Sequence, residues 1–88
     1  MTHEGEPLST KSVEEIGDLV VTALRALAAR PDRAAFEELL RASDEAGQCL
    51  GLSARTLADH GSWSQVADVA GTTKQAAWSR WSQPPRNV

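Results

Sequence analysis

Apolar residues recur every three or four positions through most of this chain, and that spacing limits its fold more than any other feature. Val13 opens one such series, which runs to Leu27, and Phe36 opens a second, which runs to Leu57. A period near 3.6 residues belongs to the amphipathic α-helix, because it aligns apolar side chains along one stripe. We therefore expect an all-α fold: a long N-terminal helical hairpin followed by a C-terminal helix-turn-helix, with four helices in total.

Pro31 separates the two series. Its ring disfavours a helical Arg30, so the first helix should end there, while proline suits the first turn of a new helix that starts at once and continues to Asp59. Gly47 and Gly51 each cost that second helix about 1 kcal/mol relative to alanine, which indicates either a break or a close helix crossing. The apolar phase is the same before and after both glycines. The pattern therefore favours a continuous helix with a close crossing.

Residues 62–81 carry the signals of two short helices with a tight turn between them. Ser62 and Gln65 have the spacing of a capping box, so the first of these helices should begin at Trp63. Gly71 follows the last apolar residue of that helix. A glycine there can adopt the left-handed conformation that ends a helix, because it has no Cβ to clash.

The second short helix should extend from Lys74 to Ser82. Thr72 and Thr73 are hydroxyl residues placed to cap its start, and no glycine, proline or acidic residue interrupts it. Ala77 and Trp81 are four residues apart and should face inward together. The opposite face should then be open to solvent.

That outward face carries amide, hydroxyl and cationic donors. Gln75 and Ser79 lie at its centre, Lys74 and Trp78 lie on one shoulder, and Arg80 lies on the other. A helix, a glycine turn and a second helix that presents such groups form a helix-turn-helix, whose second helix enters the DNA major groove.

The stretch resembles the helix-turn-helix of small actinobacterial DNA-binding proteins, which is similar to sigma-factor region 4 and to resolvase-type recognition helices. The family usually has an aliphatic residue directly after the turn glycine, where this chain has Thr72. The resemblance covers about 20 residues and implies a DNA-binding role. It rests on Trp63, Val66, Ala67, Gly71, the segment Thr73–Ala77, Arg80 and Trp81.

We expect a dimeric transcriptional regulator that binds double-stranded DNA sequence-specifically. Gln75 suits bidentate contact with adenine, while Lys74 and Arg80 suit phosphates. Trp78 has two open interpretations: contact with the DNA backbone or a thymine methyl group, or packing against the first helix or a partner chain. The predicted DNA-binding residues are Ser62, Thr73, Lys74, Gln75, Trp78, Ser79 and Arg80.

The distribution of charge is compatible with this hypothesis although the net charge is −3. Residues 1–60 hold eleven acids and six bases, whereas residues 61–88 hold one acid, Asp68, against Lys74, Arg80 and Arg86. An acidic body with a weakly basic tip would limit non-specific binding to phosphates. It also suits a second hypothesis, a helical protein–protein interaction module such as an adaptor, an antitoxin-like partner or an inhibitor.

A chain of 88 residues makes one small domain that is only marginally stable alone, and the first two helices have surplus apolar residues. We therefore expect a homodimer through those helices. The predicted organisation is a disordered tail at 1–9, a scaffold and dimerisation hairpin at 10–60, the helix-turn-helix at 61–83 and a tail at 84–88. No membrane span or signal segment is apparent, so the cytoplasm, in association with the nucleoid, is the expected location.

No catalytic constellation can be assembled from these residues, and we do not expect an enzyme. The sequence indicates no cofactor, no metal site and no small-molecule ligand. The single cysteine, Cys49, falls near the apolar stripe of the second helix and is interpreted as a small core residue.

Overall fold

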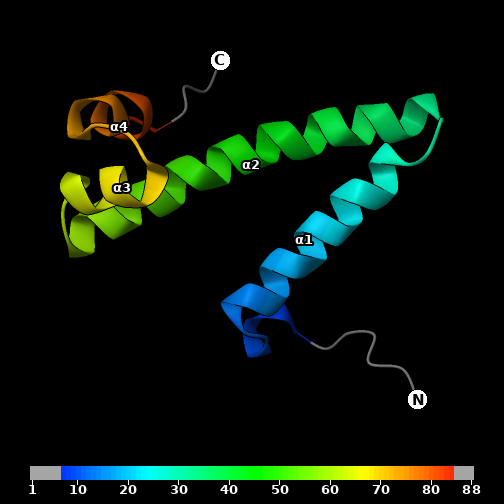
Figure 1. Ribbon diagram of the computed structural model, residues 1–88, viewed down its shortest axis with the longest axis horizontal. Helices are drawn as coiled ribbons and strands as arrows, with labels where there is room; N and C mark the ends of the chain where they lie inside the picture. Colours follow the sequence, from blue (N-terminus) through cyan, green and yellow to red (C-terminus); the bar gives the residue numbers. More distant parts are fainter. Residues whose placement is uncertain (1–6, 85–88) are drawn as a thin grey trace. The chain divides into compact units, whose positions relative to one another are not determined.

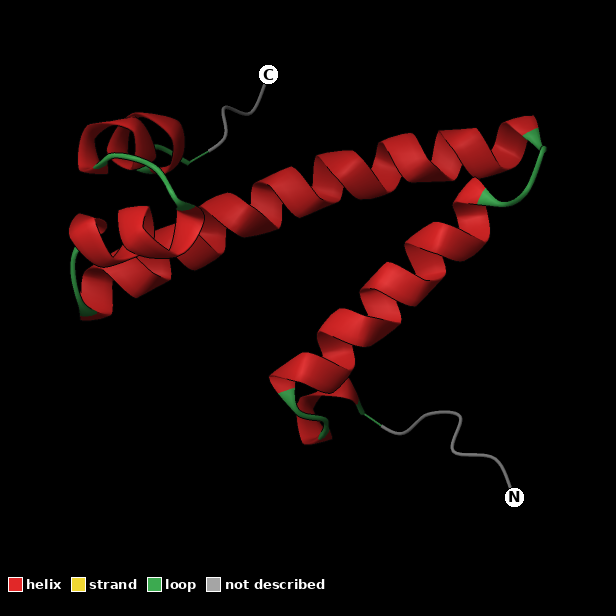
Figure 2. Cartoon of the chain, in the orientation of Figure 1, coloured by secondary structure: helices red, strands yellow, loops and turns green. Residues whose placement is uncertain are grey.

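The computed structural model describes residues 7–84, and all the regular structure in them is helical (Figures 1 and 2). The predicted all-α class with four α-helices is therefore confirmed for this part of the chain. A single turn of 3₁₀ helix precedes the α-helices. The elements are η1 (Leu8–Thr10), α1 (Val13–Ala28), α2 (Arg33–His60), α3 (Trp63–Ala70) and α4 (Lys74–Trp81).

The start of α1 is fixed by a complete capping box. The Oγ atom of Ser12 accepts a hydrogen bond from the backbone N–H of Glu15 at 3.1 Å, and the Glu15 carboxylate accepts one from the backbone N–H of Ser12 at 2.8 Å. Two backbone donors that the helix leaves unpaired are thus satisfied. The hydroxyl of Thr10 donates to the carbonyl of Pro7 at 2.8 Å and closes η1. Leu8 and Ser9, predicted as part of a disordered tail, therefore belong to a short helical turn.

The second helix begins at Arg33, later than the predicted start at Pro31. The carbonyl of Asp32 accepts the first backbone bonds of α2, from Ala35 at 3.2 Å and Phe36 at 3.4 Å. Asp32 also pairs with the Arg30 side chain at 2.6 Å, in the link between the two helices. Asp32 is a favourable residue just before a helix and takes that position here, so the helix starts one residue after the aspartate.

The second helix continues without a break for 28 residues, as the constant apolar phase predicted. Gly51 is buried, and a Cβ built there would lie 3.2 Å from Nη1 of Arg55 and 3.9 Å from Cδ1 of Trp81. The expected close approach is therefore present at Gly51. A Cβ at Gly47 would meet nothing within 4 Å, so the same expectation is wrong for that position.

The chain divides into two compact units, Met1–Leu40 and Arg41–Val88. In the first unit Ala35 is buried, while α1 has no buried residue. The core of the second unit consists of Ala54, Val66, Ala67 and Ala77, with Ala58, Trp63 and Trp81 packed against it. Because Ala54 and Ala58 belong to α2, the C-terminal half of that helix is part of the same unit as α3 and α4. The predicted boundary between the hairpin and the helix-turn-helix, at residues 60 and 61, falls at the short link between α2 and α3.

Candidate nucleic-acid interface

The first helix of the motif, α3, begins at Trp63 as predicted because Ser62 caps it. The Ser62 Oγ atom accepts a hydrogen bond from the backbone N–H of Gln65 at 3.2 Å. This is the hydroxyl half of the predicted capping box. Trp63 packs against the core that contains Val66 and Ala67. Ser62 itself is exposed, so its first role in the structure is to hold the start of α3.

The turn between α3 and α4 depends on Gly71, which has φ of 70° and ψ of 38°. Its N–H bonds to the carbonyl of Asp68 at 3.4 Å, and the N–H of Thr72 bonds to the carbonyl of Ala67 at 3.0 Å. These two bonds form a Schellman motif, which satisfies carbonyls that the helix end leaves unpaired. Thr72 is exposed, so the side chain directly after the turn glycine does not add to the core here.

Thr73 starts the second helix of the motif. Its Oγ1 atom accepts a hydrogen bond from the backbone N–H of Ala76 at 3.1 Å. Thr73, one of the predicted DNA-binding residues, is therefore the cap of α4. The hydroxyl hydrogen does not take part in that bond, so the side chain can still donate to an acceptor outside the protein.

The inward side of α4 is fixed by one small residue and one aromatic ring. Ala77 is 1% exposed and lies in the core cluster, and Trp81 packs against the same cluster. Gln75 and Ser79, on the opposite side of the helix, are both exposed. The predicted orientation of α4 is therefore what the structure has. Packing of α3 on α4, with α2 beneath, holds this orientation (Figure 1).

Three of the predicted residues surround one shallow hollow on the surface of α4. They are Lys74, Gln75 and Trp78. Trp78 is 51% exposed and is not one of the side chains packed on the core cluster. Both of its interpretations, contact with DNA and packing against the first helix or a partner chain, remain open. Its aromatic face is available to a molecule that approaches α4 from solvent.

The cationic side chains of α4 lie at its two ends. Lys74 is at the first helical position, and Arg80 is in the last turn with its guanidinium 5.3 Å from the centroid of the Trp81 ring. Both residues are exposed. The helix contains no acidic residue, so an anion that approaches its outward face meets no like charge on α4. Arg86, counted among the cations of this region, lies outside the described residues.

Arg55 is a positioning residue that the sequence analysis did not single out. Its Nη1 atom donates to the carbonyl of Trp81 and to the carbonyl of Gln83, each at 3.2 Å. These carbonyls lie at and beyond the C-terminal end of α4, where a cation is favoured by the helix dipole. Arg55 thus ties α2 to the end of the candidate recognition helix. The available signal was a lone arginine within the apolar stripe of α2, between Ala54 and Leu57.

Two residues of α2 that lie outside the motif are Cys49 and His60. Cys49 is exposed, so its interpretation as a core residue is wrong. The reason is that α2 turns this position away from the core side that carries Ala54 and Ala58. His60 ends α2, and its Nδ1 atom lies 2.9 Å from the carbonyl of Thr56, the position expected of a histidine at a helix end.

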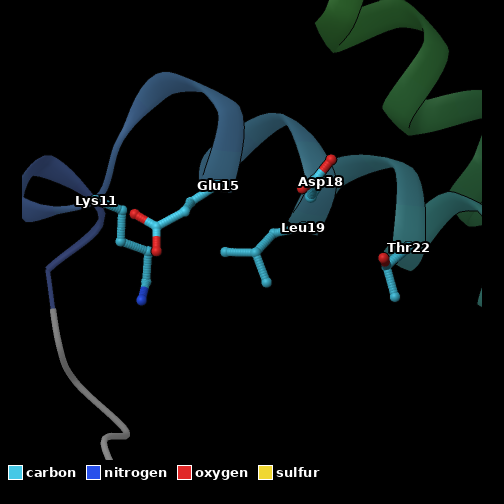
Figure 3. Close-up of a pocket in the computed structure, with 5 residues that line it drawn as sticks. All are labelled: Lys11, Glu15, Asp18, Leu19 and Thr22. Carbon is cyan, nitrogen blue, oxygen red and sulfur yellow. The ribbon is translucent and has the colours of Figure 1, made fainter.

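A second surface hollow lies along α1 and is lined by side chains of mixed charge (Figure 3). The Ser12 backbone bond to Glu15, together with the nearby Lys11, lowers the pKa of the Glu15 carboxyl below its ordinary value. This hollow belongs to a single helix face, and its acidic groups do not suit a phosphate. Its lining residues are Lys11, Glu15, Asp18, Leu19 and Thr22.

Within residues 7–84, no group of three or more histidine, cysteine, aspartate or glutamate side chains is arranged to hold a metal ion. The described helices also include none that is long and apolar enough to cross a membrane. No known protein family, curated protein or solved structure matches the chain.

Proposed function

We propose that this chain binds double-stranded DNA sequence-specifically through α4 and acts as a dimeric transcriptional regulator. The observation that carries the proposal is the two-sided character of α4. Ala77 and Trp81 attach the helix to the core, while Gln75 and Ser79 remain exposed on the other side. A short helix held in this way after a tight turn is the arrangement by which helix-turn-helix proteins present residues to the major groove.

Each exposed group on α4 has a chemical role in this proposal. The Gln75 amide can donate and accept at once, which matches the N6 and N7 atoms of adenine. Ser79 lies one turn further along the same face and can bond to a base edge. Lys74 and Arg80 neutralise phosphates on either side, and the exposed Ser62 hydroxyl adds a backbone contact. Thr73 contributes its hydroxyl hydrogen from the start of the helix.

The proposed dimer forms through α1 and α2. All the apolar residues of α1 remain at least partly accessible, and Val20 is 53% exposed. Phe36 on α2 is 62% exposed. Large apolar side chains left accessible in a small protein mark a surface that another chain covers. A two-fold dimer would present two copies of α4 to half-sites about 34 Å apart, and would double the small number of cations that meet phosphate.

A regulator of this kind would act on the nucleoid in the cytoplasm. DNA binding should weaken steeply with rising salt, because each phosphate contact releases counterions. Two such chains supply four cations from Lys74 and Arg80 alone. The slope of the logarithm of affinity against the logarithm of salt concentration should therefore be about −3.6, at about −0.9 for each of the four contacts.

The test is a mobility-shift assay at low salt with two substitutions on α4. Gln75→Ala should relax discrimination at one base pair by about 1–3 kcal/mol, whereas Lys74→Ala should weaken binding to all sequences and reduce the salt slope. Gln48→Ala and Arg25→Ala are matched controls, because they remove an exposed amide and an exposed cation from other helices. If neither substitution on α4 changes binding more than its control does, α4 is not the recognition helix.

A second candidate function is a helical module that binds another protein. The observation in its favour is an apolar groove between α2 and α3, at the edge of which Val69 is 81% exposed. Leu50 and Leu57 of α2 contribute the opposite wall. Light scattering with and without duplex DNA separates the two candidates. Absence of DNA binding at every salt concentration would favour the protein-binding module.

A further inference from the structure

The hollow on α4 has a composition that sets it apart from a simple phosphate contact. It combines the side chain of Lys74, which has an aliphatic stem and a terminal ammonium group, with the amide of Gln75 and the indole ring of Trp78. Trp63 and Trp81 pack against the core of this unit, but Trp78 does not, and it remains 51% exposed. A large aromatic side chain held next to a polar amide on a solvent-facing helix is an arrangement for contact with a surface that is apolar at one point and polar beside it.

The spacing of the three residues explains why they form one hollow. Lys74 and Trp78 are four residues apart and are therefore neighbours on the helix surface. Gln75 is three residues from Trp78 and is therefore its neighbour too. The core side of α4, marked by Ala77 at 1% exposure, faces away from them. A ligand in the hollow would therefore touch the apolar wall of Trp78 and the amide of Gln75 together.

The edge of an A·T base pair in the major groove offers that combination. Adenine presents an acceptor and a donor, N7 and N6, and thymine presents an acceptor and the apolar methyl group at C5. The G·C pair has no methyl group unless the cytosine is methylated at the same C5 position. Among unmodified bases, only thymine can therefore fill an apolar hollow next to an amide.

We infer that the hollow between Lys74, Gln75 and Trp78 is a binding site for the 5-methyl group of a pyrimidine in the major groove. The methyl group packs on the ring of Trp78, and Gln75 bonds to the neighbouring adenine. Lys74 closes the hollow with its aliphatic stem and directs its ammonium group to a phosphate. The inference rests on the proposed DNA-binding function and extends it by naming the chemistry that α4 reads.

The experiment removes the methyl group without any other change in the DNA. A preferred duplex is selected from random sequences, and each thymine in it is replaced in turn by deoxyuridine. At one position per half-site, affinity measured by fluorescence anisotropy should fall about fourfold, which is the effect of removing one buried methyl group from an apolar contact. Duplexes with cytosine or 5-methylcytosine at that position, opposite guanine, form a second pair that differs by the same methyl group.

The two pairs distinguish the source of the methyl group. A methyl effect in both pairs means that the hollow accepts any 5-methylpyrimidine, and an effect in the thymine pair alone means that it accepts thymine. Trp78→Ala should abolish the effect, and Trp78→Phe should retain most of it, because phenylalanine keeps an aromatic wall. Val69→Ala is the matched control: it trims an exposed apolar residue of α3 and should leave the methyl effect unchanged.

Failure of the methyl-site inference and failure of the proposed DNA-binding function give different results. If no thymine in the selected site is sensitive to loss of its methyl group, or if Trp78→Ala shows the same sensitivity as the unmodified chain, the hollow does not receive a methyl group although DNA binding stands. If the unmodified chain binds no duplex in the selection, the proposed function itself fails. A far-UV circular dichroism spectrum of Trp78→Ala that matches the unmodified chain confirms that the fold is retained, as expected for a half-exposed side chain outside the core.

Discussion

Replacement of Arg55 by methionine should destabilise the unit that presents α4. Methionine keeps an apolar stem of similar length but removes both hydrogen bonds from Nη1 to the carbonyls of Trp81 and Gln83. A hydrogen bond from a charged donor contributes about 1.5–3 kcal/mol when it is short and protected. Here one nitrogen serves two acceptors at 3.2 Å, and the contact with Gln83 is exposed. We therefore expect a loss of about 1–2 kcal/mol in the free energy of unfolding.

Tryptophan fluorescence during urea unfolding is a direct assay for this loss. All three tryptophans lie between residues 63 and 81, so their signal reports the unit that contains α3 and α4. With an m value of roughly 1.5 kcal/mol per molar urea, the midpoint should fall by about 1 M. The urea midpoint of Arg55→Lys should lie between those of the unmodified chain and Arg55→Met, because lysine keeps the charge but not the planar donor geometry.

Arg25→Met serves as the control, since Arg25 is an exposed residue of α1 in the other unit. Its fluorescence transition should coincide with that of the unmodified chain. An Arg55→Met midpoint equal to that of the unmodified chain would refute the inference that Arg55 holds the end of α4.

Substitutions at the glycines and in the capping box of α1 should also have measurable effects. Gly71→Ala should lower the free energy of unfolding by about 1–2 kcal/mol, because φ of 70° is strained for alanine; an unchanged urea midpoint would mean that the turn relaxes. Gly47→Ala should raise helix stability by about 1 kcal/mol, since its Cβ meets nothing within 4 Å. Gly51→Ala should gain less stability than Gly47→Ala, because its Cβ would lie 3.2 Å from Nη1 of Arg55. A higher unfolding temperature for Gly51→Ala than for Gly47→Ala would contradict this close approach. The lowered pKa of Glu15 means that its carboxylate stabilises α1 above the ordinary glutamate pKa, and that this stability is lost as pH falls through the lowered value. Carboxyl titration by NMR should show the Glu15 pKa rising part of the way toward its ordinary value when Ser12 is changed to alanine, because the hydroxyl bond is lost while the Ser12 backbone bond remains; no rise would show that the hydroxyl does not contribute.

The sequence was sufficient to predict the helices because their signals are local. Ser12 with Glu15, Ser62, and Gly71 each act through bonds to residues within a few positions, so spacing alone identifies the helix starts and the turn. The uninterrupted second helix followed from the apolar phase around Gly47 and Gly51. The start of that helix was placed too early because proline and aspartate both favour the first turn, and the aspartate determines the boundary.

The features that the sequence did not predict depend on contacts between distant residues. Arg55 reaches carbonyls 26 and 28 positions away, and its place within the apolar stripe of α2 does not say which carbonyls it will meet. The exposure of Cys49 also follows from the position of α3 and α4 on one side of α2, since its place near an apolar stripe does not say which side is covered. The outward orientation of Gln75 and Ser79 could be predicted, because Ala77 and Trp81 define the opposite side at helical spacing.

The most direct measurement of the central proposal is a two-dimensional ¹H–¹⁵N NMR titration of the chain with a selected duplex. If α4 reads DNA, the backbone amides of residues 73–80 should shift or broaden strongly as DNA is added, together with the amide of Ser62. The indole N–H of Trp78 should change while that of Trp63 stays in place, because Trp63 packs against the core. Amide changes confined to α1, or a spectrum that DNA leaves unaltered at low salt, would contradict the assignment of α4 as the DNA-reading helix.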